Sequence, residues 1–149
     1  MVEKIRFLDK IKIFQKVLLK DGEGRLLVLK RSEENQTRQG CWDFPGGNFE
    51  KGEDIVKAAE REVREETKLE VDRLIPIYVE SSGGRRNDGV DVIAIAYLST
   101  EFSGEIGLSN EHDEYRWVKL EEFLEMDTGE DGGFLKASVR AYLDRYANK

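Results

Sequence analysis

One segment constrains the fold of this chain more than any other: residues 54–67 combine helical periodicity with acidic residues on the face that has to be buried. With about 100° of rotation per residue and Ile55 set at zero, Val63 lies at about 80°, and the two mark an apolar stripe. Glu66 then lies at about 20°, inside the stripe, and Glu62 at about 340°, at its edge. Because an amphipathic helix packs its apolar stripe against a sheet or another helix, this fold has to bury at least one carboxylate.

The acidic residues near the stripe predict a metal-binding face. Glu62 and Glu66 are four residues apart, with Glu65 beside them. Like charges at this spacing repel each other, and partial burial strengthens the repulsion and raises the carboxyl pKa values. Hard divalent cations such as Mg²⁺ stabilise clustered carboxylates of this kind. An ordinary solvated face explains only the charged residues on the far side of the helix: Lys57, Glu60 and Arg64.

The rest of the chain mixes strands and helices. Residues 11–19 and 25–31 are rich in strand formers on either side of a Gly-rich turn, which predicts a β-hairpin. Residues 42–47, Trp-Asp-Phe-Pro-Gly-Gly, predict a short strand that ends at its glycines. Further predicted elements are strands at 75–81, 90–98 and 115–118, a short helix at 120–125 and an amphipathic helix after residue 133. This order lacks the strict alternation of a parallel sheet and favours an α+β fold, with a mixed sheet and flanking helices.

Composition excludes several classes of protein. The 149 residues fit a single domain, 1–149. A net charge of −7 argues against a polymeric nucleic acid as partner, because affinity for the phosphate backbone rests on Lys and Arg. Cys41 is the only cysteine, so an intrachain disulfide and a Cys-based zinc site are excluded. No apolar run approaches the roughly 18–20 residues of a membrane span. We expect a cytoplasmic protein with no membrane partner; its oligomeric state is open, with a homodimer among the alternatives.

A longer pattern surrounds the acidic helix. Gly47, Glu53 and the run Arg61-Glu-Val-Arg-Glu-Glu-Thr-Lys-Leu69 resemble the Nudix box, Gly-x5-Glu-x7-Arg-Glu-U-x-Glu-Glu-x-Gly-U, in which U is a bulky aliphatic residue. Every fixed position matches except Lys68, where the family usually has glycine. The resemblance implies a Nudix-type α/β/α sandwich, with a mixed β-sheet flanked by the box helix and a C-terminal helix. Lys68 in a left-handed helix end costs about 1 kcal/mol relative to glycine, so we expect it to affect stability and not catalysis.

The resemblance also implies a metal site and a reaction. Three carboxylates and one backbone carbonyl would bind the metal: Glu62, Glu65, Glu66 and Gly46. Arg61 would orient these carboxylates, with Glu53 as its partner. The cofactor would be Mg²⁺, with Mn²⁺ as a substitute. The reaction would be hydrolysis of a phosphoanhydride bond in a nucleoside diphosphate linked to another moiety, with metal-activated water as the attacking group.

One further acidic residue is predicted to take part in catalysis. The stretch from Glu111 to Trp117 resembles the region where many Nudix hydrolases place an additional metal ligand or general base. Glu111 is our candidate for both roles and Glu114 is the alternative; a solvated acidic loop is the non-functional interpretation. The sole histidine, His112, is interpreted as a bystander or hydrogen-bonding residue.

Candidates for substrate binding are spread along the chain. Arginine offers two parallel donors to a phosphate, which makes candidates of Arg31, Arg38, Arg85 and Arg86. Trp42 is either a platform on which a base stacks or a core residue at the end of a strand.

The resemblance implies a small nucleotide or nucleoside diphosphate derivative as the substrate, but the motifs leave its class open. A proline near residue 84 and a tyrosine near residues 85–87 are cues for ADP-ribose and dinucleoside polyphosphate hydrolases respectively, and this chain has neither. By elimination we expect a MutT-like (d)NTP pyrophosphohydrolase. An ADP-ribose, nucleotide-sugar or dinucleoside polyphosphate hydrolase is the alternative. A non-catalytic nucleotide-binding module is less favoured because all three box carboxylates are present, and isoprenoid diphosphate isomerisation has little support.

Overall fold

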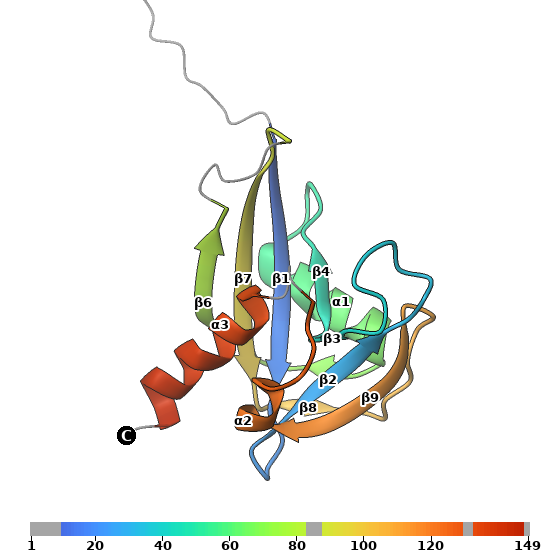
Figure 1. Cartoon of the computed structure of the whole chain (residues 1–149), viewed down its shortest axis with the longest axis vertical. Helices are drawn as coiled ribbons and strands as arrows, with labels where there is room; N and C mark the ends of the chain where they lie inside the picture. The colour runs from blue at the N-terminus through green and yellow to red at the C-terminus, as the bar shows by residue number, and fades with distance from the viewer. Residues whose placement is uncertain (1–9, 83–87, 130–132, 148–149) are drawn as a thin grey trace, which may run out of the picture.

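The computed structural model describes residues 10–82, 88–129 and 133–147, and its strands form a mixed sheet and two antiparallel ones (Figure 1). The largest sheet has the order β4 (Gly46–Asn48), β1 (Ile11–Leu19), β7 (Asp91–Ser99) and β6 (Ile75–Ser81). β1 runs parallel to β7, whereas the other pairs of this sheet are antiparallel. The second sheet has the order β3 (Trp42–Asp43), β2 (Arg25–Arg31) and β9 (His112–Lys119). A two-stranded sheet joins β5 (Glu70–Val71) to β8 (Phe102–Ser103).

Helices cover both faces of the large sheet, as the α/β/α prediction requires (Figure 1). The helices are α1 (Ile55–Thr67), α2 (Leu120–Phe123) and α3 (Gly133–Tyr142), which continues as a π-helical segment at Leu143–Ala147. Alternate residues of β1 enter two different cores. Leu18 packs with Phe134 and Val139 of α3, whereas Val17 and Leu19 pack with the apolar residues of α1. No helix among the described residues is long and apolar enough to cross a membrane.

The predicted hairpin of β1 and β2 is wrong beyond its turn. The Asp21 carboxylate accepts hydrogen bonds from the backbone N–H groups of Glu23 and Arg25, which closes the turn as expected. Only one bridge, between Lys20 and Leu26, then joins the two arms. Beyond it the strands enter different sheets, because β4 and β7 occupy the edges of β1 while β3 and β9 occupy those of β2.

The predicted strand at 42–47 is two strands that connect the sheets. β3 pairs with β2, and after Phe44 and Pro45 the chain pairs with β1 as β4. Gly46 has φ +145°, and a Cβ there would lie 2.0 Å from the Gln15 carbonyl oxygen, so only glycine fits. A short loop then leads from β4 to α1, and Glu62 and Glu66 in the C-terminal half of that helix lie against the two glycines of β4.

α1 has the boundaries expected from its sequence. The Asp54 carboxylate caps its N-terminus by accepting a hydrogen bond from the Lys57 backbone N–H at 3.0 Å. The helix ends at Lys68, which adopts the left-handed conformation with φ +67° and donates its backbone N–H to the Arg64 carbonyl oxygen. The non-glycine residue at this box position therefore does carry the backbone strain that the sequence predicts.

Candidate active site

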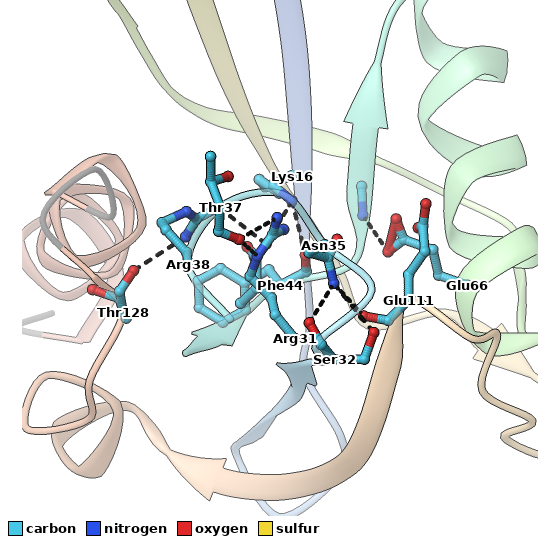
Figure 2. Close-up of polar contacts among 12 residues, drawn as sticks. Lys16, Arg31, Ser32, Asn35, Thr37, Arg38, Phe44, Glu66, Glu111 and Thr128 are labelled. Atoms are coloured by element: carbon cyan, nitrogen blue, oxygen red, sulfur yellow. Dashed lines mark hydrogen bonds and ion pairs between the residues drawn. The ribbon is translucent and has the colours of Figure 1, made fainter. Parts of the chain in front are cut away.

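The buried carboxylate of α1 lies against the glycines of β4. Glu66 is only 5% exposed, and its carboxylate accepts a hydrogen bond of 3.2 Å from the Gly46 backbone N–H (Figure 2). Burial raises the pKa of Glu66 well above its usual range, and the Lys16 ammonium only partly opposes this effect. A carboxyl group in this position could hold a further cation, because that cation would relieve the cost of burial.

Glu62 lies one turn earlier and packs against Gly47. A Cβ at position 47 would lie 2.6 Å from the Glu62 carboxyl carbon, so the glycine leaves room for this carboxylate. Burial raises the pKa of Glu62, Arg61 opposes the rise, and the neighbouring carboxylates of Glu65 and Glu111 add to it. Glu62 and Glu66 therefore form one acidic wall.

Arg61 links the remaining box carboxylates. Its guanidinium donates two hydrogen bonds to Glu53, at 2.8 and 2.9 Å, one of 3.2 Å to Glu62, and two to the oxygens of Glu65, at 3.2 and 3.3 Å. These bonds raise the pKa of Arg61 above its usual value, with the Glu53 bond as the largest favourable contribution. Glu65 is the most exposed of the three box carboxylates, and in this structure its partner is Arg61.

Glu111, from another part of the chain, is the third residue of the acidic wall, which we define as Glu62, Glu66 and Glu111. It immediately precedes β9, and its carbonyl oxygen accepts hydrogen bonds from the Ser32 backbone N–H and the Asn35 side chain (Figure 2). Its side chain lines the same cavity as Glu62 and Glu66, about 640 Å³ in volume. The alternative candidate, Glu114, instead pairs with Arg116 at 2.6 Å and lines neither this cavity nor the larger one that adjoins it.

The oxygen atoms of the acidic wall are of the kind that a hard cation binds. Their side chains, however, do not point at one common position in this structure. No three His, Cys, Asp or Glu side chains of the described residues form a group that could hold a metal ion in their present positions. Carboxylates and backbone carbonyls are nevertheless the oxygen ligands that Mg²⁺ prefers. Two of these carboxyl groups also have pKa values raised by burial, which a bound cation would lower again.

Facing the acidic wall is a basic cluster that we define as Lys16, Arg31, Arg38 and the carboxylate of Asp43. Asp43 is fully buried, and one of its oxygens lies 3.0 Å from Lys16 Nζ and 3.2 and 3.3 Å from the two guanidinium groups. Burial alone would raise the pKa of Asp43, but the three cations outweigh it and hold this pKa below its usual value. The three cations line a cavity of about 1310 Å³ that also reaches Glu62, Glu66 and Glu111.

The structure distinguishes among the predicted substrate-binding residues. Arg31 and Arg38 line the cavity. Trp42 does not: it is 8% exposed in the core, with the Arg116 guanidinium 4.6 Å from its ring centre. The structure therefore fits the interpretation of Trp42 as a core residue. It does not fit the interpretation in which a base stacks on the Trp42 ring. Arg85 and Arg86 lie outside the described residues.

Sequence reasoning did not single out Lys16 or Asp43. The one signal for Lys16 was a charged residue inside a run of strand formers, where the alternation of apolar and polar residues breaks down. Asp43 had a similar signal, as an acidic residue between Trp42 and Phe44. In both cases the pairing depends on contacts across 27 residues of sequence, which local patterns do not reveal.

His112 lies beside the basic cluster and has an unusual environment. It pairs with Arg31 across β9 and β2 and is 6% exposed. Burial lowers the pKa of His112 to about 4, so the imidazole is neutral at pH 7. Its Nδ1 is the one buried side-chain nitrogen or oxygen of the described residues that lacks a hydrogen-bond partner.

This fold and this acidic wall define a member of the Nudix hydrolase family. Residues 15–137 match the NUDIX domain, so the chain belongs to that family. It is a pyrophosphohydrolase that acts on nucleoside diphosphate derivatives.

Individual relatives agree with this assignment. The nucleoside triphosphatase NudI of Escherichia coli is 26% identical over 114 residues, which cover 71% of this chain and 81% of NudI. The MutT protein of Methanosarcina mazei Go1 has a crystal structure with a TM-score of 0.77 and 30% identity, over 94% of this chain and 97% of that one. The Nudix domain of Shewanella oneidensis NrtR, solved with ADP ribose, shares the fold at 17% identity with a TM-score of 0.71, over 92% and 90% of the two chains.

The first prediction concerns the space beside Glu62. We expect Gly47→Ala to displace the Glu62 carboxylate, because the added Cβ would occupy its position. A displacement of about 1 Å can lower activity about 100-fold. Stability should change by less than about 1 kcal/mol, since the contact is with the end of a flexible side chain. Steady-state kinetics and urea unfolding measure the two effects. Gly22→Ala, where the Cβ meets nothing within 4 Å, is the control, and full activity of Gly47→Ala would contradict the assignment.

The second prediction concerns Asp43. Asp43→Asn leaves three partly buried cations without their carboxylate, and we expect a loss of about 3–5 kcal/mol in the free energy of unfolding at pH 7. Because the pKa of Asp43 is lowered in the folded protein, its stabilising effect is present above the unfolded-state pKa of about 4. The effect disappears as the pH falls through the lower folded-state value. Urea unfolding of both proteins from pH 7 to pH 3 should therefore show a shrinking difference, and a difference that grows toward acid would contradict this account.

Proposed function

We propose that this protein is a Mg²⁺-dependent pyrophosphohydrolase of (d)NTPs. The observation that carries the proposal is one cavity in which carboxylates from α1 and the start of β9 face the basic cluster. A nucleoside triphosphate needs both sides: oxygen ligands for the metal that accompanies it, and cations for its remaining charge.

The acidic wall would hold the metal. Its ligands would be the carboxylates of Glu62, Glu65, Glu66 and Glu111 and the carbonyl oxygen of Gly46. Bound Mg²⁺ would neutralise phosphate oxygens and lower the pKa of a bound water. Mn²⁺, which accepts the same oxygen ligands, is expected to substitute.

The chain's own residues would orient the reactants. Arg61 keeps Glu53, Glu62 and Glu65 in one network, which limits the motion of the box carboxylates. Glu111 would accept a proton from the attacking water, because its backbone is fixed by the loop after β2 while its carboxylate faces the cavity. Arg31 would bind a phosphate with the guanidinium N–H groups that Asp43 and Thr37 leave unused.

The choice of triphosphates is supported by the relatives and by the charge of the cavity. NudI is named as a nucleoside triphosphatase, and the structural relative at 30% identity is a MutT protein. The neighbour that binds ADP ribose shares the fold alone. The experiment is a panel of (d)NTPs, ADP-ribose, nucleotide sugars and dinucleoside polyphosphates assayed for product release with Mg²⁺ or Mn²⁺. We expect the highest kcat/KM for a triphosphate, and a higher value for ADP-ribose would contradict the proposal.

The third prediction tests the proton acceptor. Glu111→Gln keeps the size of the side chain but removes its basicity, and we expect kcat to fall about 100-fold to 10,000-fold with little change in KM. Glu114→Gln is the matched control on the same segment, because Glu114 pairs with Arg116 outside the cavity, and its kcat should stay within about twofold of the wild type. Unchanged turnover in Glu111→Gln would remove this residue from the mechanism.

A further inference from the structure

The basic cluster carries more positive charge than its internal contacts balance. Three cations surround the single carboxylate of Asp43, which leaves a surplus of 3 − 1 = 2 positive charges. The cations are largely buried, with side chains that are 10%, 15% and 18% exposed. Keeping unbalanced charge away from water is costly, so a cluster that served the fold alone would gain stability from a second or third acidic partner. Lys16 also interacts with Glu66, but that carboxylate belongs to the acidic wall.

The cluster also has unused hydrogen-bond donors. Lys16 donates to Asp43 and to the Phe44 carbonyl oxygen, which leaves one of its three N–H groups. Arg31 donates three bonds, to Thr37 and Asp43, and Arg38 donates two, to Thr128 and Asp43. Each guanidinium has five N–H groups, so both retain donors beyond the bonds found among the described residues. Figure 2 shows the three cationic groups gathered between β1 and the loop that follows β2.

His112 adds an independent sign that a ligand belongs here. His112 is one of the residues around the same cavity, and its buried Nδ1 has no partner among the described residues. Buried polar atoms in folded proteins are nearly always hydrogen-bonded, so an unpartnered one beside unused cationic donors indicates a missing polar partner.

We propose that Lys16, Arg31, Arg38 and His112 form a subsite for a terminal phosphate, the end of a nucleoside triphosphate that is not capped by a second group. The proposal rests on the proposed function and extends it by naming the residues that select the substrate class. A terminal phosphate carries a charge of about −1.5 to −2 at neutral pH, which matches the surplus of the cluster. Each phosphate of a capped diphosphate such as ADP-ribose carries only one charge and offers no free end. Asp43 holds the cations in place and would not touch the ligand.

The test compares two probes by isothermal titration calorimetry in Mg²⁺ buffer: inorganic tripolyphosphate, which has free ends, and ADP-ribose, which has none. Arg38→Gln should weaken tripolyphosphate binding about tenfold or more, the usual effect of losing a hydrogen bond to a charged group. ADP-ribose binding should change less than about threefold. Arg38→Lys, which keeps the charge, should retain most of the tripolyphosphate affinity. The control Arg64→Gln removes the same charge from an exposed position on α1 and should change neither probe.

Lys16→Met provides a second variant, and thermal unfolding by circular dichroism shows whether each variant is folded. Arg38 lies in a loop, and its replacement leaves Asp43 with two cations, Lys16 and Arg31. The Arg38→Gln variant is therefore sufficient for the test even if Lys16→Met unfolds. Tripolyphosphate that does not bind the wild type, or binds folded Arg38→Gln equally well, would overturn the subsite. An equal loss for both probes would overturn its assignment to a terminal phosphate. Failure of the proposed function would be seen separately, as wild-type enzyme that prefers a capped substrate in the turnover panel.

Discussion

Moving a carboxylate out of water has a cost that other groups have to offset, and two carboxylates of the described residues, Asp43 and Glu66, are buried near the crossover between the two main sheets. Asp43 and Glu66 are compensated in different ways. Asp43 is surrounded by three cations, so its pKa is lowered and it remains ionised. Glu66 has one backbone N–H and a more distant ammonium, so its pKa is raised. Asp43 therefore has its charge balanced by side chains of the protein itself. Glu66 has fewer partners, and a bound cation could balance its charge.

The crossover between β3 and β4 carries Asp43 and ends at Gly46, the residue that contacts Glu66. Within a few residues, its path from one sheet to the other puts Asp43 among the three cations of the basic cluster and Gly46 against Glu66. Gly46 is required because the Gln15 backbone leaves no room for a side chain, and Gly47 leaves room for the Glu62 carboxylate. The two glycines of the Pro-Gly-Gly sequence therefore provide the space that the acidic wall needs.

Local periodicity was sufficient to predict α1, its buried Glu66 and the face it shares with Glu62. The mixed sheet and its flanking helices also followed from the order of the elements. The hairpin prediction failed because local strand propensity does not show that both edges of β1 are taken by distant strands. Arg31 and Arg38 of the basic cluster were predicted as phosphate-binding candidates, but Lys16 and Asp43 were missed for the same reason as the hairpin: they meet only after the two sheets pack, and neither has a motif of its own. Substrate stacking on Trp42 was considered from the sequence alone, but the packing of β3 places that ring in the core.

We propose that the acidic wall is a metal site. Titration of Mn²⁺ followed by electron paramagnetic resonance measures it directly, because free and bound Mn²⁺ give distinguishable signals. Loss of a ligand should weaken binding about tenfold or more in Glu66→Gln and in Glu62→Gln, while the exposed control Glu70→Gln binds like the wild type. Equal Mn²⁺ affinity in the wild type and in the two folded wall variants would contradict the account.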